Sequence, residues 1–355
     1  MKPKKLRVAL LFGGRSAEHE ISLVSASAIY RHLDKKKYEI VSFYLPRQGG
    51  WKEVASPLSP PNELEEGPSF PFLPWEMTQK FSYPEIDIYF PVLHGPYGED
   101  GTIQGMLELA GVPYVGAGVL ASALGMDKVA MKAAFASRNL PLVPYLSFIE
   151  REWEKRAKEI IDQIRSTFPL PLFVKPANLG SSVGITKVKT WDELEEAVKI
   201  AFNYDRKVLI EEGIPAREIE CSVLGNDEPR ASLPGEVIPF REFYDYKDKY
   251  IEGKTGFKIP ADLTPDQIAK VQHLSIEAYR AIDCSGMARV DLFLDRRNGA
   301  IYINEVNTIP GFTEISMYPK LWEASGLPFS QLLDELIILG FERFEKKKKC
   351  LRPSL

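Results

Sequence analysis

The chain has 355 residues, a length that favours two or three domains. Its 45 Lys and Arg and 49 Asp and Glu leave a formal charge of −4, unlike the strongly basic composition typical of nucleic-acid binders. The apolar content of 45% and charged content of 26% exclude disordered, collagen-like and coiled-coil chains. Three scattered cysteines and the lack of an apolar run of about 20 residues predict a cytoplasmic protein that does not span a membrane.

Residues 6–45 predict a βαβ unit. The run 6–12 is continuously apolar, as expected of a parallel strand buried on both faces. Gly13 and Gly14 then turn the chain, and helical spacing over 21–33 precedes a second apolar run at 39–45. The βαβ pattern indicates an α/β fold for the start of the chain.

The segment 46–84 interrupts this regularity, because it is rich in proline and aperiodic. We expect an irregular excursion here and assign it no role. The elements predicted after it are a strand at 86–93, a polar turn at 94–101, a helix at 102–110 and a short strand at 112–115. These elements complete an N-terminal α/β domain over residues 1–120.

Two further α/β units are predicted, over 121–205 and 206–355. The elements expected in the first are a helix at 127–137, strands at 144–148, 170–175 and 185–188, and a capped helix at 193–202. Those expected in the second are strands at 207–211 and 217–224, a long loop at 241–260, a helix from Pro265, strands at 288–294 and 300–306, and a helix at 329–344.

The late hairpin carries the strongest chemical signal. Arg289 and Asp291 alternate with apolar residues on one strand, and Glu305 and Asn307 lie on the next. Period-two alternation places each pair on one face. Charges on a half-buried face need a partner or a metal ion, and two carboxylates with an amide oxygen suit Mg²⁺. A solvent-facing hairpin with a surface ion pair is the alternative.

A glycine-rich turn at 180–184 follows a strand that ends at Lys175. Small residues let backbone N–H groups surround phosphate oxygens, and a lysine supplies a point charge. The turn is not a P-loop, because the Walker A spacing is absent and a strand follows. Taken alone it is better explained as an ordinary loop. The downstream carboxylate pair strengthens the case for phosphate binding.

The turn after the first strand is acidic, with Glu18 and Glu20 beside His19. It lacks the G-x-G-x-x-G spacing of a dinucleotide site. Either the acids complement a helix dipole, or a carboxylate at this sheet edge binds a substrate ammonium group. His94 ends a strand at the same edge and either joins that pocket or is structural.

The segment 241–256 is charged and rich in tyrosine. It lies in sequence between the nucleotide-like and metal-like elements. Such a loop is either a lid that excludes water, here over 243–256, or a mobile solvated loop.

Six motifs, in the right order, resemble those of the D-alanine–D-alanine ligases of the ATP-grasp superfamily. They are GGRSAEHEISL at 13–23, HGPYGEDG at 94–101, GAGVLASALGMDK at 116–128, VKP…GSSVG at 174–184, FYDYKDKY at 243–250 and EVNTIPG at 305–311. The resemblance covers essentially the whole chain. It implies an ATP-grasp fold of three α/β domains, with the nucleotide between the central and C-terminal domains.

The resemblance also implies the residues that bind ATP and metal. The expected nucleotide contacts are Lys128 and Lys175 with the α- and β-phosphates, Lys249 with the γ-phosphate, Ser181 and Ser182 in the glycine-rich turn, Glu211 with the adenine amino group, Ile214 in the hinge, and Glu218 with the ribose. Asp291, Glu305 and Asn307 match the metal ligands. Two Mg²⁺ ions are expected, Mn²⁺ could replace them, and a monovalent cation is compatible with the resemblance.

For the amino-acid substrates the resemblance implies a second group of residues. Glu18 matches the carboxylate that holds the ammonium of the first D-alanine near His94, with Ser181 and Tyr250 as its partners. Arg289 and the Gly311 N–H match the oxyanion site, and Ser316 matches the group that receives the second carboxylate. The expected catalytic set is Glu18, Ser181, Tyr250, Arg289 and Gly311.

The implied reaction joins two D-alanine molecules through a D-alanyl phosphate, releases ADP and phosphate, and serves peptidoglycan precursor synthesis. A homodimer is the family expectation, with no nucleic acid or membrane as partner. One alternative is a D-alanine–D-lactate ligase, against which Tyr250 argues. The other is a non-catalytic ATP-grasp nucleotide-binding protein, which should have lost some of Lys175, Arg289, Asp291, Glu305 and Asn307. All five are present.

Overall fold

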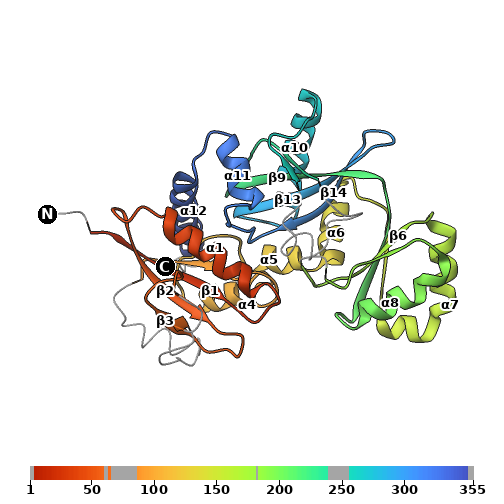
Figure 1. The fold of residues 1–355 in the computed structure, drawn as a ribbon, viewed down its shortest axis with the longest axis horizontal. Coiled ribbons are helices and arrows are strands. Elements are labelled where there is room, and N and C mark those ends of the chain that lie inside the picture. The colour runs from red at the N-terminus through yellow and green to blue at the C-terminus, as the bar shows by residue number, and fades with distance from the viewer. Residues whose placement is uncertain (1–3, 60–62, 65–85, 181–182, 239–255, 351–355) are drawn as a thin grey trace.

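The computed structural model describes residues 4–59, 63–64, 86–180, 183–238 and 256–350. Within them the chain forms three β-sheets with helices on their faces (Figure 1). This is the mixed α/β architecture that the sequence predicted. Ser181, Ser182, Lys249 and Tyr250, and all of the predicted lid except Gly256, lie outside the described residues.

The N-terminal sheet has the strand order β3-β2-β1-β4. β1 is parallel to β2 and β4, and its side chains alternate between a core beneath α1 and one beneath α4. The first strand is therefore buried on both faces, as predicted. The elements are β1 (Leu6–Gly13), α1 (His19–His32), β2 (Tyr38–Leu45), β3 (Lys52–Val54), β4 (Ile88–Val92) and α4 (Thr102–Leu109).

The central sheet is antiparallel, with the order β5-β8-β6-β7. α7 and α8 supply the apolar side chains that cover one face, and Thr190 and Glu193 form the predicted capping box. α7 was not predicted. The elements are β5 (Tyr145–Ile149), α7 (Glu150–Thr167), β6 (Leu172–Pro176), β7 (Thr186–Val188), a 3-10 turn (Trp191–Glu193), α8 (Leu194–Phe202) and β8 (Lys207–Glu212).

The C-terminal sheet has the order β12-β11-β9-β13-β14, with β10 paired to β9. The predicted hairpin is β13–β14, and Thr264 caps α10 as expected. The elements are β9 (Ala216–Gly225), β10 (Arg230–Ala231), β11 (Gly235–Ile238), β12 (Gly256–Lys258), α10 (Pro265–Ala281), β13 (Gly286–Asp295), β14 (Ile301–Asn307), α11 (Met317–Ala324) and α12 (Phe329–Cys350).

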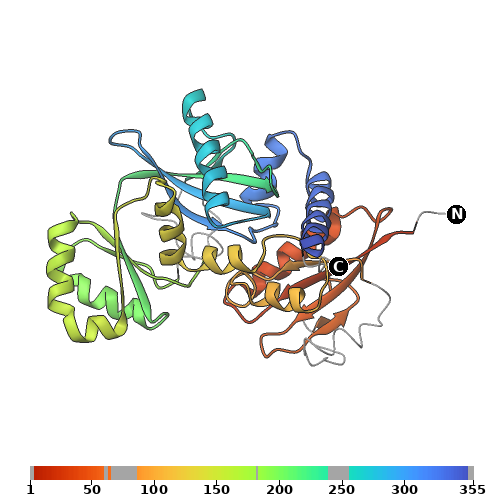
Figure 2. The ribbon, with the colours of Figure 1, turned by 180° about the vertical axis from the view of Figure 1, so that it is seen from behind.

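Two helices from the middle of the sequence belong to the C-terminal core. α5 (Val119–Met126) and α6 (Lys128–Ser137) contribute Ala121, Met131 and Phe135 to the cluster beneath β13 and β14. Figure 2 shows both helices between the N-terminal and central sheets. The chain passes from the central to the C-terminal sheet at 213–215, because β8 still pairs with β5 and β6. This crossover lies later in the sequence than the predicted boundary at 205.

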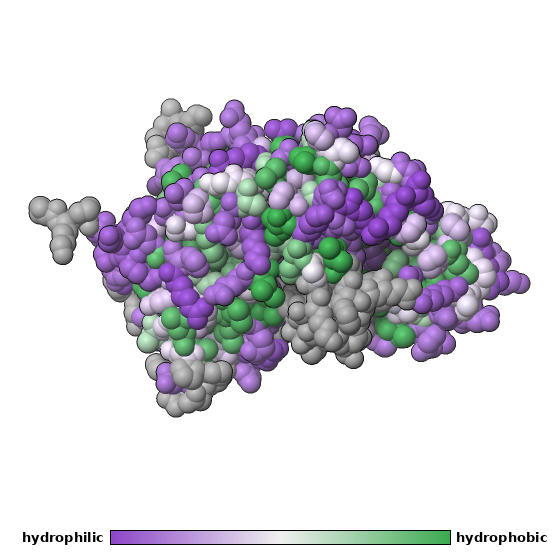
Figure 3. Space-filling model, turned by 45° about the horizontal axis from the view of Figure 1, so that its top comes forward, coloured by the Kyte–Doolittle hydropathy of each residue, from purple (hydrophilic) through white to green (hydrophobic). Residues whose placement is uncertain are grey.

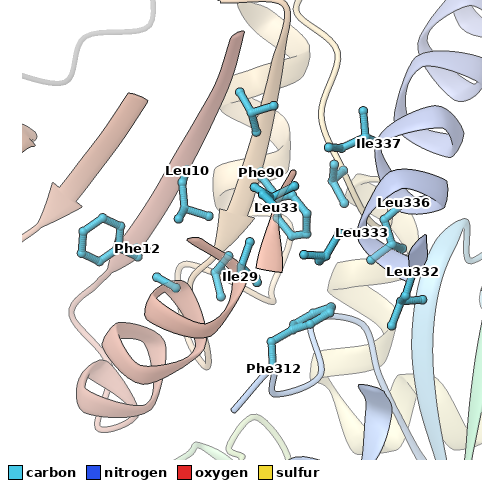
Figure 4. Packing of buried hydrophobic residues seen from close by; sticks show 14 of the residues in the cluster. Leu10, Phe12, Ile29, Leu33, Phe90, Phe312, Leu332, Leu333, Leu336 and Ile337 are labelled. Atoms are coloured by element: carbon cyan, nitrogen blue, oxygen red, sulfur yellow. The ribbon is translucent and has the colours of Figure 1, made fainter. Parts of the chain in front are cut away.

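The end of the chain returns to the N-terminal sheet. Leu332, Leu333 and Leu336 of α12 pack with Ile29 of α1 and Phe90 of β4 in one buried cluster (Figure 4). This contact joins the last helix to the first sheet across the sequence. It brings the segment before α11 close to the turn after β1.

The surface carries both hydrophilic and hydrophobic side chains, in keeping with the mixed composition of the chain. On the face shown in Figure 3, hydrophilic side chains cover much of the surface and hydrophobic ones gather toward its middle. Of the helices in the described part of the chain, none combines the length and apolar character needed to cross a membrane.

Candidate active site

A cavity of about 480 Å³ lies between the central and C-terminal sheets. Its size is in the range of small-molecule sites. It is the place where the sequence predicted a nucleotide. The lining residues that were predicted as site residues are Lys128, Lys175, Glu211, Ile214, Glu218, Asp291 and Glu305.

Arg289, Asp291 and Asn307 meet at one end of this site. Both oxygens of Asp291 accept hydrogen bonds from the Arg289 guanidinium, each at 2.6 Å, and Asn307 Nδ2 donates to Asp291 Oδ2 at 3.1 Å. Arg289 Nε also lies 3.1 Å from Glu220 Oε2. Arg289 is therefore paired with Asp291 on its own strand and with Glu220 on the neighbouring β9, and Asn307 joins this group from β14.

A β-bulge in β14 turns Glu305 toward the cavity. Asp291 pairs with Glu305, but the next residue, Leu292, pairs with Ile303, so Asn304 is the extra residue. Without the bulge, period two would place Ile303 and Glu305 on the same face. Instead Ile303 is buried in the core and Glu305 lines the cavity.

Lys128 reaches the same end from the first turn of α6. Its Nζ lies 3.5 Å from Glu305 Oε2 and donates to the Leu179 carbonyl at 2.6 Å. Its backbone N–H donates to the Ala177 carbonyl at 3.0 Å. Lys128 therefore joins the acidic hairpin to the chain that leads into the glycine-rich turn.

Glu211 is held between two lysines at the other end. Lys175 Nζ donates to its Oε2 at 2.5 Å, and Lys132 Nζ lies 2.6 Å from its Oε1. Burial alone would raise the pKa of Glu211, but the two ammonium groups lower it to about 2. The carboxylate is therefore ionised at neutral pH.

The segment after Glu211 forms the hinge between the sheets. Gly213 N–H donates to the Pro171 carbonyl at 2.8 Å, and Ile214 and Glu218 line the cavity beyond it. Arg297 from the β13–β14 turn lies 3.6 Å from Glu212. The hinge thus presents an apolar side chain and a carboxylate to the same cavity.

Glu18 lies at the start of α1, half-buried, close to two glycines from distant segments. A Cβ atom on Gly95 would lie 2.7 Å from Glu18 Oε2, and one on Gly180 would lie 3.1 Å from it. Gly180 also lines the nucleotide-like cavity. The fold thus brings the acidic turn of the N-terminal sheet to the glycine-rich turn of the central unit.

His94 is buried behind this turn. Its Nδ1 is 3.0 Å from the Ile309 carbonyl and 3.7 Å from Glu99 Oε1, and its Nε2 is 3.0 Å from Ser25 Oγ. Burial lowers the pKa of His94, but Glu99 and the other nearby acceptors outweigh burial, so the pKa is raised. In this arrangement His94 ties the segment after β14 to α1.

Gly311 and Ser316 lie on that same segment. Phe312 N–H donates to Ser25 Oγ at 3.2 Å, and a Cβ on Gly311 would lie 2.7 Å from Ser316 Oγ. Ser316 Oγ accepts from the Thr313 N–H at 3.0 Å. The residue predicted for the oxyanion site and the one predicted for the second carboxylate are therefore adjacent.

The donor set fits the groups that the resemblance implies. Mg²⁺ takes one or two carboxylates and completes its shell with water and phosphate oxygens. Asp291 and Glu305 face each other across β13 and β14, with Asn307 bonded to Asp291. Among the described residues no three His, Cys, Asp or Glu side chains form a metal-binding group, and the candidate set here has two carboxylates and one amide.

Two residues of the site were missed by the sequence reasoning. Lys132 follows Lys128 by one helical turn, and its charge among buried Met131 and Phe135 was a usable signal. Glu220 alternates with Ile219 and Cys221 on β9, so period two could have placed it on the cavity face.

Comparisons with known proteins agree with these observations. A family profile described as D-ala D-ala ligase N-terminus matches residues 7–117, and one described as D-ala D-ala ligase C-terminus matches residues 134–338. Proteins named D-alanine–D-alanine ligase from Natranaerobius thermophilus and Thermoanaerobacter sp. are 49% and 51% identical. The alignments cover 98% of both chains for the first, and 97% of this chain and 99% of the relative for the second.

Solved structures show the same likeness. The D-alanine-D-alanine ligase from Coxiella burnetii is 38% identical, with a TM-score of 0.81 over 98% of this chain and 97% of that one. The VanG D-Ala:D-Ser ligase from Enterococcus faecalis is 36% identical, with a TM-score of 0.83 over 95% of this chain and 100% of that one.

Proposed function

This chain belongs to the D-alanine–D-alanine ligase family of ATP-dependent ligases, which have the ATP-grasp fold, and we propose how its residues perform that activity. The activity joins two D-alanine molecules into D-alanyl-D-alanine for cell-wall synthesis, with ATP as the energy source. The observation that carries the proposal is the cavity between the two sheets, which has lysines, an acidic hinge and two facing carboxylates in its lining.

ATP fits this cavity with its base at the hinge and its phosphates toward the hairpin. Glu211 and the Ile214 segment would contact the adenine, and Glu218 the ribose hydroxyls. Lys128 and Lys175 would bind the phosphates, with Ser181, Ser182 and Lys249 as further proposed contacts. The charges support this orientation. Asp291 and Glu305 are the carboxylates that would hold a metal ion, and phosphate groups bound beside that ion would have their charge neutralised.

The first D-alanine would bind at the junction of Glu18, His94 and the glycine-rich turn. The Glu18 carboxylate matches an ammonium group in charge, and it lies beside Gly180, which also lines the ATP cavity. The substrate carboxylate would thereby point toward the γ-phosphate. Ser181 and Tyr250 are proposed as partners of Glu18.

The chemistry requires an activated carboxylate, because an unactivated one is a poor acyl donor. The D-alanine carboxylate attacks the γ-phosphorus and forms D-alanyl phosphate with release of ADP. The amine of the second D-alanine then attacks the acyl carbon, and phosphate leaves. Arg289 and the Gly311 N–H are proposed to stabilise the oxyanion, and Ser316 to receive the second carboxylate.

Asp291, Glu305 and Asn307 are proposed to hold two Mg²⁺ ions, which Mn²⁺ could replace. When bound, the metal supplies charge neutralisation for phosphoryl transfer. The protein itself contributes the fixed geometry of the hairpin, where Arg289 and Asn307 keep Asp291 oriented. We also propose a monovalent-cation requirement, a homodimeric assembly, a cytoplasmic location and a lid role for 243–256.

The decisive test is ADP release by the purified chain with D-alanine, L-alanine and D-lactate offered in turn at pH 7. We expect rapid ADP release with D-alanine and formation of D-alanyl-D-alanine. Predominant D-alanyl-D-lactate in a mixture of acceptors would refute the assignment in favour of a depsipeptide ligase. Absence of D-alanine-dependent ADP release would favour a nucleotide-binding protein without catalysis.

The variant Glu305→Gln tests the metal assignment. It removes one negative charge where Mg²⁺ would bind and keeps the size of the side chain. We expect a folded protein, by circular dichroism, that has lost D-alanine-dependent ADP release. Glu314→Gln, on an exposed side chain beyond the end of β14, is the control and should retain activity. Unchanged ADP release by the Glu305 variant would contradict the assignment.

A further inference from the structure

Lys132 is a buried charge for which the proposed chemistry has no use. Its side chain is 1% exposed, and it is not among the described residues that line the cavity. Its Nζ lies 2.6 Å from Glu211 Oε1 and 5.5 Å from the centre of the Tyr145 ring. Burial lowers the pKa of Lys132, and a lysine is kept in such a place only at a cost in free energy.

The ion pair joins two units of the fold. Lys132 belongs to α6, which packs against the C-terminal sheet, whereas Glu211 belongs to β8 of the central sheet. A second ion pair, Lys207 to Asp127, joins the same strand to the N-cap residue of α6. Neither Lys207 nor Asp127 is among the cavity-lining residues. If fastening α6 to β8 were the whole requirement, the Lys207–Asp127 pair would serve it.

The two lysines on Glu211 differ in what else they can reach. Lys175 lines the cavity, so its ammonium group can exchange the Glu211 carboxylate for a phosphate and stay paired. Lys132 lies behind Glu211 and does not line the cavity, so its ammonium group cannot leave Glu211 for a phosphate bound there. When Lys175 turns to a phosphate, Lys132 is the counter-ion that stays with the buried carboxylate.

We propose that Lys132 is a positioning residue for ATP, which holds Glu211 by its Oε1 so that Oε2 accepts a hydrogen bond from the adenine amino group. This proposal rests on the ATP site proposed above. The same arrangement of Lys132 and Glu211 would select adenine over guanine nucleotides. A carboxylate accepts from the amino group of adenine, whereas the corresponding oxygen of guanine offers no proton and would face a negative charge.

The test compares Lys132→Met and Lys132→Arg with Lys207→Met as the matched control. The readouts are the Kd of Mg-ATP by calorimetry without D-alanine, and the separate KM values for ATP and D-alanine. For Lys132→Met we expect a Kd about 10- to 100-fold higher, by analogy with the loss that follows removal of a partner that orients a metal ligand. The KM for D-alanine should stay near wild type, and Lys132→Arg should recover most of the affinity.

The control separates positioning from fastening. Lys207→Met removes the other ion pair between α6 and β8, so its Kd for ATP should stay within about threefold of wild type. Equal losses in the Lys207 and Lys132 variants would overturn the proposal. So would a wild-type Kd in Lys132→Met, or a failure of Lys132→Arg to recover affinity in a folded protein.

A double variant covers the case in which Lys132→Met does not fold. Lys132→Met with Glu211→Gln removes both charges of the pair, and its Kd for ATP should equal that of Glu211→Gln alone. A further tenfold loss in the double variant would overturn the proposal. Because the calorimetric Kd needs no D-alanine, it can stay unchanged in Lys132→Met while ligation is observed, and it can rise as expected while ligation fails.

Discussion

The two junctions that form the site are built from different interactions. At the amino-acid end, the N-terminal sheet meets the segment 309–316 through backbone carbonyls, a serine hydroxyl and buried His94, above the apolar core that α12 completes. At the nucleotide end, the ion pairs of Lys132 and Lys207 join the α6 region to β8 of the central sheet, and that of Lys128 joins α6 to β14.

The contrast between hydrogen bonds and ion pairs indicates at which end the side chains can exchange a protein partner for a ligand. A lysine that leaves a carboxylate for a phosphate remains paired, so a junction of ion pairs can accept a polyanion at little electrostatic cost. Hydrogen bonds to backbone carbonyls allow no such exchange. The amino-acid end is therefore expected to be a fixed platform, and the nucleotide end an adaptable one.

Among variants that compare the two junctions, the largest expected effect is that of Lys175→Met at the nucleotide end. It removes a charge proposed to bind phosphate, while Lys132 still pairs with Glu211. We expect kcat/KM for ATP to fall about 10²- to 10³-fold, measured by ADP release. Lys199→Met, on the exposed face of α8, is the control. A loss below about threefold, comparable with that of the control, would contradict the phosphate role of Lys175.

A smaller effect, on stability, is expected from Leu333→Ala at the amino-acid end. Leu333 is fully buried in the cluster shared by α12, α1 and β4. Its truncation should lower the free energy of unfolding by about 2–5 kcal/mol, measured by denaturant titration. Ile338→Ala, exposed on the same helix, should change it by less than about 0.5 kcal/mol. The Kd for ATP should be unchanged, and a large shift would mean that the two ends are coupled.

The smallest effect is a pH dependence from His94. Because its pKa is raised in the folded chain, its stabilising contribution is full below the unfolded value of 6.5 and is lost as pH rises through the folded pKa. The groups that face it are Glu99, Glu18, Ser25 and the Ile309 carbonyl. The stability difference between wild type and His94→Gln should therefore shrink above pH 6.5, by less than the effect of Leu333→Ala. A stability difference that grows as pH rises would contradict a raised pKa of His94 in the folded chain.

Much of the local structure was readable from the sequence. Continuous apolar runs marked the buried strands, and Thr264 with Gln267 marked the start of α10. Alternation placed Arg289 and Asp291 on one face. α7 was missed although its polar residues repeat around a narrow apolar stripe with buried Ile160 and Ile164. These signals are short-range, and they follow from the repeat of a helix or strand.

The balanced charge of the chain, 45 basic against 49 acidic residues, excluded classes of partner but said nothing about pairing. The sequence by itself determined the α/β class, the family and most of the charged residues that line the cavity. Only the tertiary structure decided that β14 bulges at Asn304, that α6 belongs with the C-terminal core, and that Lys132 stands behind Glu211. The reason is physical: a bulge and a buried ion pair depend on contacts between segments far apart in the chain, which no local periodicity records.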